Sequence, residues 1–541
     1  MSASSPGGED LRNRRDVVVV GAGFAGMYML HLLRQRGFRV QVLEAGDDVG
    51  GTWYWNRYPG ARCDIDSMAY SYSFDDDLQQ EWHWPHRFAY QADILRYARH
   101  VAERFDLRRD ILFGTEVTSA VFDEDASEWT LTTAHGERYI APFCIMATGC
   151  LSVPKVPDIP GLDDFAGALY HTADWPREEI DFSGQSVGII GTGSSGIQCI
   201  PIIARQAKHL TVFQRTPNFN VPSWNAPIPP EQEAEIKKNY AYYREKARHA
   251  ISADFLDEAR LELAEASDEV RRQELEKCWQ AGGFDIQYAF SDLFTSEEAS
   301  DIACEFVRDK IREIVRDPKV AETLCPYDHP IGSKRLCVDD AYYQTYNRDN
   351  VMLADLRCTP IKRIVPEGVR TSDTTFELDA LVLATGFDAM TGALTRIDIR
   401  GRDGRSLREA WAGGPRAYLG LAIADFPNLF TITGPGSPSV LTNMMVAIEQ
   451  HVNWVGDCLV HMREHGIVEI EASTAAQDDW VRHVNETAEA TLYPRANSWY
   501  VGANVPGKAR VFMPYVAGQG PYKEICDRIA GYHYEGFKLA S

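Results

Sequence analysis

Uninterrupted apolar runs between turn signals predict buried parallel strands in this chain. Residues 16–20 read DVVVV, which is typical of a strand buried on both faces of a parallel sheet. A glycine-rich turn follows, and then apolar side chains such as Leu30 and Leu33 indicate an amphipathic helix. A second apolar strand, over residues 39–43, ends at Glu44. This order of elements predicts a βαβ unit near the amino terminus.

The turn of this unit has the spacing of a dinucleotide-binding loop. Gly21 permits the tight turn, Gly23 lets a pyrophosphate approach the backbone, and Gly26 lets helix and strand pack closely. The following helix offers free N–H groups and a positive dipole end to phosphates. Glu44 is placed to accept hydrogen bonds from a ribose diol. Together these elements predict a dinucleotide site, a stronger prediction than the glycines alone allow.

The same pattern recurs after residue 185 with one difference. Residues 186–190 read SVGII and lead into a second loop, Gly191-Thr192-Gly193-Ser194-Ser195-Gly196. The next strand, residues 210–213, ends in Gln214-Arg215-Thr216, without the acid found in the first unit. A guanidinium there would bind a 2′-phosphate that a carboxylate would repel, which favours NADPH over NADH. The alternative, that Arg215 is a solvated surface charge, stays open.

Two further strands and one helical region complete the pattern. FCIMATG ends at Gly149 and LVLATG ends at Gly386, and each strand is expected to return the chain to one of the two sheets. Residues 225–330 are rich in Glu, Lys, Arg and Ala, with helical spacing in stretches such as 258–265. Prolines 227, 229 and 230 mark the start of this region. We expect a helical insertion whose charges are solvated helix faces.

Composition narrows the function classes. The chain has 541 residues, enough for roughly three or four units, and a net charge of −23, which argues against binding nucleic acid or anionic membranes. No run approaches the about 18 apolar residues of a membrane span. The 11 cysteines include no CxxC pair, which disfavours a zinc site or a disulfide reductase and fits a reducing cytoplasm. No metal-ligand spacing is visible, so no metal is expected.

A segment between the two loops carries a family resemblance. Residues 165–176 read FAGALYHTADWP and resemble the FxGxxxHTxxW[P/D] signature of type I Baeyer–Villiger monooxygenases. The matched positions are Phe165, Gly167, His171, Thr172 and Trp175. The family comparison implies a linker between domains, in which His171 and Trp175 couple domain position to turnover rather than perform chemistry. Segments 433–444 and 497–508 look most like the phenylacetone and steroid monooxygenases of that family.

The resemblance also implies site residues. For FAD these are Gly21, Gly23, Gly26, Glu44, Thr52, Trp53, Trp55, Asp64, Tyr70, Val117 and Met444. For NADP they are Arg62, Thr192, Gly193, Ser194, Ser195, Gly196, Gln198, Arg215, Thr216, Lys334 and Trp499. Arg335 is implied as the active-site arginine with Asp64 as its partner, and Ser439, Val440 and Leu441 as lining of a ketone pocket.

The implied fold is α/β, with two Rossmann-like dinucleotide-binding domains and a helical insertion. An FAD domain would comprise residues 1–150 and 390–541, an NADPH domain residues 151–224 and 331–389, and the insertion residues 225–330. The implied reaction inserts one oxygen atom of O₂ beside the carbonyl of a small ketone, through a C4a-peroxyflavin, to give an ester or lactone. We expect a cytoplasmic monomer or weak homo-oligomer.

Two other functions remain open from the sequence. The first is a flavin-dependent S- or N-oxygenase, or an uncoupled NADPH oxidase, because the same chemistry serves soft nucleophiles. The second is a non-catalytic dinucleotide-sensing or scaffold protein, which the presence of Asp64, Lys334 and Arg335 beside both loops disfavours.

Overall fold

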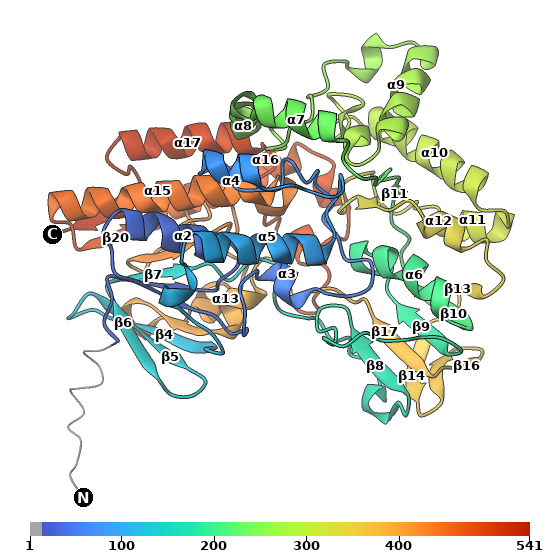
Figure 1. The fold of residues 1–541 in the computed structure, drawn as a ribbon, viewed down its shortest axis with the longest axis horizontal. Helices are drawn as coiled ribbons and strands as arrows, with labels where there is room; N and C mark the ends of the chain where they lie inside the picture. Colours follow the sequence, from blue (N-terminus) through green and yellow to red (C-terminus); the bar gives the residue numbers. More distant parts are fainter. Residues whose placement is uncertain (1–12) are drawn as a thin grey trace, which may run out of the picture.

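Two parallel sheets of five strands organise the molecule (Figure 1). The computed structural model describes residues 13–541, so residues 1–12 of the predicted FAD domain lie outside the described residues. The first sheet has the order β19-β7-β1-β2-β3. Its strands are β1 (Val17–Val20), β2 (Val40–Leu43), β3 (Ile111–Leu112), β7 (Phe143–Met146) and β19 (Leu429–Thr431). The predicted βαβ unit and the return of FCIM beside β1 are confirmed.

The second sheet repeats this arrangement in the order β13-β10-β9-β17-β8. Its strands are β8 (Ala168–His171), β9 (Ser186–Ile190), β10 (His209–Gln214), β13 (Val351–Asp355) and β17 (Ala380–Leu383). The predicted strand at 186–190 is confirmed at both ends, and LVL pairs with it as expected. All four strand pairs are parallel, and β17, which reads ALVL, is apolar and buried at every position, as expected for a central strand covered on both faces.

One helix follows each glycine loop and carries the chain to the next strand. α2 (Phe24–Gln35) joins β1 to β2, and α6 (Ser194–Gln206) joins β9 to β10. The first turn of each starts directly after the loop, so the free N–H groups point to the same edge where the strands end. Both loops therefore lie at the carboxyl edge of their sheet.

The helical region starts and ends at a short pair of parallel strands, β11 (Asn220–Val221) and β12 (Cys337–Val338). Its helices are α7 (Pro230–Lys238), α8 (Tyr240–His249), α9 (Asp268–Ala281), α10 (Glu297–Ile314) and α11 (Pro318–Leu324). In Figure 1, α7 and α8 lie over the first unit beside α17 (Gln519–Gly531), whereas α9 to α11 extend over the second. Arg244 of α8 is buried against Ala69 and Ser71 of the first unit.

The prediction of helix over residues 258–265 is wrong. This stretch is irregular except for a single 3₁₀ turn, η3 (Leu263–Glu265). Its backbone is held by tertiary contacts instead: Ser291 N donates to Leu261 O at 3.0 Å, and Arg271 donates to Leu263 O. Leu263 is buried in the hydrophobic core of the second unit, and these tertiary contacts outweigh the local preference for helix.

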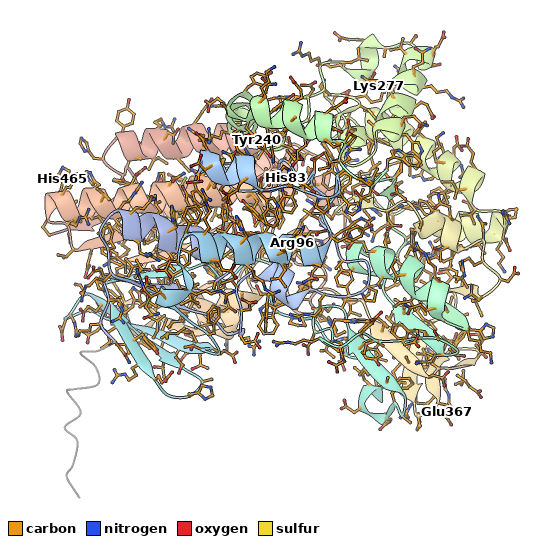
Figure 2. All side chains as sticks on the ribbon, viewed as in Figure 1. His83, Arg96, Tyr240, Lys277, Glu367 and His465 are labelled. Atoms are coloured by element: carbon orange, nitrogen blue, oxygen red, sulfur yellow. The ribbon has the colours of Figure 1, made fainter. Side chains whose placement is uncertain are left out.

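The remaining elements complete the two units. Beside the first sheet lie α3 (Thr52–Trp55), α4 (Asp76–Glu81), α5 (Gln91–Arg104), β4 (Val117–Asp123), β5 (Glu128–Thr133), β6 (Arg138–Ala141), α13 (Gly392–Arg396), β18 (Asp398–Arg400), α14 (Leu407–Ala410), α15 (Met444–His465), β20 (Glu469–Ala472), α16 (Thr474–Glu489) and β21 (Phe537–Ala540). Beside the second lie α12 (Tyr342–Thr345), β14 (Ile361–Val365), β15 (Gly368–Thr371) and β16 (Thr375–Glu377). His465 and Glu367 mark opposite sides of the molecule in Figure 2.

No helix in residues 13–541 has both the length and the apolar character that crossing a bilayer requires.

Candidate active site

An arginine–carboxylate pair joins the two units. Arg335 lies just before β12, and Asp64 lies after α3. The Arg335 guanidinium donates from Nη2 to Asp64 Oδ1 at 2.7 Å and from Nε to Oδ2 at 2.9 Å. Burial alone would lower the pKa of Arg335, but the Asp64 carboxylate holds that pKa above its ordinary value. The pair is therefore a fixed fork with two charge-assisted hydrogen bonds.

Two further contacts fix the orientation of this guanidinium. Its Nη1 donates to the carbonyl oxygen of Val440 at 2.7 Å. The guanidinium carbon lies 4.7 Å from the centre of the Phe284 ring. Sequence patterns gave no signal for Phe284, because it lies in the helical insertion, far from Arg335 along the chain.

The first glycine loop has the shape of a dinucleotide cradle. A Cβ on Gly26 would lie 1.8 Å from Gly21 O, so only glycine fits against the loop. A Cβ on Gly23 would meet Gly51 Cα at 3.4 Å, which leaves its outer side free for a ligand. Glu44 accepts from Ala22 N at 2.6 Å and from Gly46 N at 2.7 Å, and burial raises its pKa. These residues fit an adenine dinucleotide.

Two of the three aromatic residues predicted beside the flavin contact each other edge to face. Trp53 is buried in α3, and its indole Nε1 donates to Tyr70 OH at 3.1 Å. Trp55, in the same helix, is 41% exposed. Of the other residues predicted for FAD, Thr52 starts α3, Val117 starts β4 and Met444 starts α15.

The second glycine loop is open where a cofactor would approach. A Cβ on Gly193 would meet nothing within 4 Å, whereas one on Gly196 would lie 2.3 Å from Gly191 O. Ser194 and Ser195 start α6. Thr192 Oγ1 donates to Thr216 O at 3.0 Å, which links this loop to the end of β10. The second cradle therefore has both the close packing and the open face that a pyrophosphate needs.

Positive charge gathers beside this second loop. Arg215 is exposed, and Lys334 forms an ion pair with Asp328 at 3.4 Å. Burial lowers the pKa of Lys334, and the neighbouring Arg215 charge acts in the same direction. Lys155, which sequence patterns did not single out, is close enough that Arg215 also helps to lower its pKa, after burial. A phosphate dianion fits this cluster.

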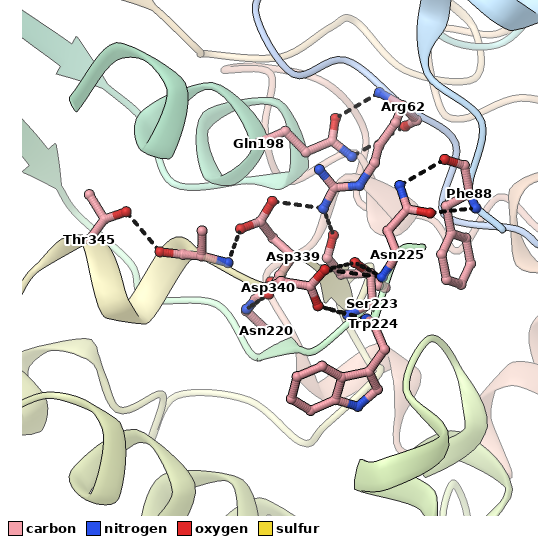
Figure 3. A network of polar contacts seen from close by, with 12 residues as sticks. Arg62, Phe88, Gln198, Asn220, Ser223, Trp224, Asn225, Asp339, Asp340 and Thr345 are labelled. Atoms are coloured by element: carbon pink, nitrogen blue, oxygen red, sulfur yellow. Dashed lines mark hydrogen bonds and ion pairs between the residues drawn. The ribbon is translucent and has the colours of Figure 1, made fainter. Parts of the chain in front are cut away.

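Arg62 and Gln198 belong to a polar network between the units (Figure 3). Arg62 Nη2 donates to Asp339 Oδ2 at 2.7 Å, and both side chains are almost fully buried. Gln198 of α6 donates from Nε2 to Arg62 O at 3.2 Å. Arg335 and Asp339 flank the short strand β12, and Arg62 and Asp64 lie close together in the first unit. Two ion pairs therefore join the same two segments: in one the arginine comes from the first unit, and in the other it comes from the second.

The neighbouring Asp340 organises the start of the helical insertion in the same network (Figure 3). Its carboxylate accepts from Ser223 N and Trp224 N, each at 2.7 Å. Asn225 then accepts from Phe88 N at 2.9 Å and donates to Phe88 O at 3.0 Å. The insertion is thereby attached to the first unit beside the Arg62 pair.

The signature segment lies on the second sheet. His171 ends β8, and its Nε2 lies 3.2 Å from both Lys155 O and Thr385 Oγ1. Burial lowers the pKa of His171, which favours the neutral ring. Thr172 and Trp175 are buried, Phe165 is half-buried, and a Cβ on Gly167 would lie 2.5 Å from Asp379 O. These contacts join β8 to residues of the same unit.

A narrow pocket opens beside Arg335. Its cavity volume is about 30 Å³. Of the predicted ketone-pocket residues, Leu441 lines it, Val440 contacts Arg335 only through its carbonyl, and Ser439 is buried with its Oγ donating to Thr433 O. Trp499 is half-buried, and its neighbour Tyr500 lines the pocket instead. The other lining residues that sequence patterns missed include Asp254, Gln287, Tyr288 and Tyr493.

Comparisons with known proteins agree with this geometry. Residues 18–290 match the family model described as pyridine nucleotide-disulphide oxidoreductase. The acetone monooxygenase (methyl acetate-forming) of Gordonia sp. (strain TY-5) is 43% identical over 97% of this chain and 99% of its own. A Baeyer–Villiger monooxygenase of Pseudooceanicola batsensis is 43% identical over 94% and 93%.

This chain belongs to the Baeyer–Villiger monooxygenase family. The predictions of the family and of an α/β fold with Rossmann-type units are therefore confirmed.

Solved Baeyer–Villiger relatives share the whole fold. A steroid monooxygenase described as bound to NADP superposes with a TM-score of 0.94 at 50% identity, covering 97% of this chain and 99% of that one. A structure described as OTEMO in complex with FAD and NADP gives 0.94 at 40% identity, covering 97% and 99%. The predicted pair of cofactors agrees with these descriptions.

The exposed Arg215 allows a test of cofactor choice in this family member. We expect Arg215→Ala to raise KM for NADPH on the order of 10- to 100-fold, because charge-assisted bonds to the 2′-phosphate are lost. KM for NADH should change little, since NADH lacks that phosphate. Steady-state kinetics with both coenzymes measures this. Arg205→Ala, an exposed arginine of α6, is the matched control, and equal losses for NADPH and NADH would contradict the assignment.

Proposed function

We propose that this protein is an FAD-containing, NADPH-dependent enzyme that inserts one oxygen atom of O₂ beside the carbonyl of a small ketone. The ester or lactone that results is the product. The observation that carries this proposal is the Asp64–Arg335 fork, whose arginine lines a pocket. When bound, FAD would accept hydride from NADPH and activate O₂.

Arg335 serves the step in which negative charge develops. Its guanidinium lies at the pocket wall, already oriented by Asp64 and by Val440 O. Attack on a ketone carbonyl places negative charge on the carbonyl oxygen, and a preorganised cation stabilises that charge without reorganising. Asp64 acts as a positioning residue, because it holds the fork in place and balances its charge.

The two loops would place the cofactors at either side of this fork. The first loop and Glu44 fit FAD, with Trp53 and Tyr70 as flat apolar surface for the ring. The second loop fits NADPH, with Arg215 and Lys334 at its phosphate. Arg62 and Asp339 would keep the two units in register across the site.

A ketone panel tests this function directly. We expect the purified holoenzyme to convert aryl, cyclic, long-chain or steroid ketones to esters or lactones, with about one product per NADPH consumed for the preferred class. Product analysis by mass spectrometry, together with NADPH and H₂O₂ assays, measures this. NADPH consumption that yields only H₂O₂, or oxygenation restricted to amines and sulfides, would contradict the proposal and favour the oxidase or S/N-oxygenase.

We also propose a cytoplasmic location and a monomeric or weakly homo-oligomeric state. The cysteines support the location: all 11 are free thiols, ten of them buried, as in proteins of reducing compartments.

A further inference from the structure

The pocket beside Arg335 is lined by more polar groups than a plain ketone needs. Besides Arg335 and Leu441, its wall includes Asp254, Gln287, Tyr288 and Thr442. Oxygen insertion itself uses the carbonyl end of the substrate, where Arg335 lies. The other polar groups face the remaining part of whatever occupies the pocket.

Asp254 is the charged residue among these groups that lies within the helical insertion. It follows α8 and is 4% exposed. Its Oδ1 accepts from Phe255 N at 2.7 Å. Its Oδ2 has no hydrogen-bond partner within residues 13–541. Because this oxygen makes no hydrogen bond to those residues, an occupant of the pocket that supplies a donor is favoured.

The backbone around Asp254 is tied to the walls of the same pocket. Asp254 N donates to Ser252 Oγ at 3.3 Å, and Asn443 N donates to Ser252 O at 2.9 Å. Ser252 lines the pocket, and Asn443 caps α15 directly after the segment of Leu441 and Thr442. Asp254 is therefore held at a fixed place in the pocket wall.

The charged groups around Asp254 leave its carboxyl able to donate or accept near neutral pH. The pKa of Asp254 is raised to about 7, chiefly by burial; the hydrogen bond from Phe255 N opposes this rise, the carboxylates of Asp66 and Asp285 add to it, and Arg87 opposes it. Arg87 already forms ion pairs with two other carboxylates, at 3.5 Å from Asp66 and 3.9 Å from Asp285. Asp254 thus has no cation of its own, and Arg335 is engaged by Asp64.

We propose that Asp254 is a substrate-binding residue and that this pocket selects ketones that carry a hydroxyl group away from the reacting carbonyl. The inference rests on the proposed function. Arg335 would mark the carbonyl end of the substrate, and Asp254 would receive the hydroxyl at the other end. A hydrocarbon tail at that position would bury the unpaired Oδ2 and bind less well.

Matched ketone pairs that differ by one hydroxyl test the proposal with the holoenzyme. One pair is benzylacetone and its para-hydroxy derivative, and a second is a long-chain methyl ketone and its terminal hydroxy derivative. We expect the wild type to prefer the hydroxylated member in at least one pair, with kcat/KM about tenfold or more higher, mainly through KM. If the wild type shows no preference for the hydroxylated ketone in either pair, the proposal is overturned, whatever the variants do.

Variants then assign the preference to Asp254. Asp254→Ala should lower the kcat/KM ratio of hydroxylated to parent ketone about tenfold, whereas Asp254→Asn, which keeps an oxygen at the same place, should retain most of it. Asp257→Asn, an almost fully exposed carboxylate of the same segment, is the control and should keep the wild-type ratio. A wild-type ratio in Asp254→Ala overturns the proposal. Ester formation from the parent ketones distinguishes this failure from failure of the proposed function, which would yield no ester from any ketone.

Discussion

Replacing Arg335 by alanine is expected to leave flavin reduction by NADPH largely intact and to abolish ester formation, with a loss of at least about 10²–10³ in the oxygenation step. Arg335 touches the pocket and Asp64, whereas the NADPH cradle lies at the second glycine loop. Reduction should therefore survive while the charge that develops on the ketone loses its stabilising cation. Anaerobic stopped-flow measures reduction, and product analysis after mixing with O₂ and ketone measures oxygenation.

Arg335→Lys is the matched variant, because it keeps the charge and removes the planar fork. Asp64 accepts from two different nitrogens of Arg335, and Val440 O accepts from a third. An ammonium group cannot reproduce these directions, so this variant should also be poor. Slow flavin reduction combined with normal ester yield per reduced flavin, in either variant, would show that Arg335 serves the NADPH side instead.

Gly26→Ala is expected to produce a protein with little or no bound FAD. The new Cβ would lie 1.8 Å from Gly21 O, so the loop must move, which costs about 1–3 kcal/mol even without the cofactor. The movement removes the N–H groups from the positions where a pyrophosphate would bind. The ratio of flavin absorbance to protein absorbance after purification measures FAD content, and thermal unfolding of the apoprotein measures stability.

Gly23→Ala separates the effect on the protein from the effect on the cofactor. Its Cβ would meet Gly51 Cα at 3.4 Å, an ordinary contact, so the apoprotein should keep its stability. FAD binding should nevertheless fall, because a pyrophosphate approaches the backbone most closely at this glycine and an added methyl group would keep it farther away. Full flavin content in Gly23→Ala would mean that the pyrophosphate does not approach this residue.

The sheets could be predicted from the sequence because their signals are local. The run at residues 17–20 and the strand at 186–190 are each followed by glycines at fixed spacing. A strand buried on both faces of a parallel sheet is mostly apolar, so its sequence is easy to recognise. The prediction at residues 258–265 failed because helical spacing is also produced by leucines that pack singly. Leu263 is buried among distant residues, and the backbone there satisfies its hydrogen bonds with Ser291 and Arg271.

The site could be predicted only where a motif marks a residue. Asp64 and Arg335 lie far apart in the sequence, and family resemblance suggested their pairing, which the structure contains. Phe284, Asp254 and Asp339 carry no motif: each gains its importance from a neighbour that the fold brings to it. Asp254 in particular lies in a charged segment whose other acids, such as Asp257, are solvated. Composition alone does not distinguish one buried carboxyl from its exposed neighbours.

The order of strands along the chain determines how this protein can fold as it leaves the ribosome. β18 and β19, which complete the first unit, follow all five strands of the second sheet. All strands of the second sheet can therefore pair while the edge of β7 that later pairs with β19 is still exposed to solvent. A chain that stops after β17 would contain a complete inner unit and an open outer one, exposed to edge-to-edge aggregation. Full-length synthesis is thus the step that protects the first sheet.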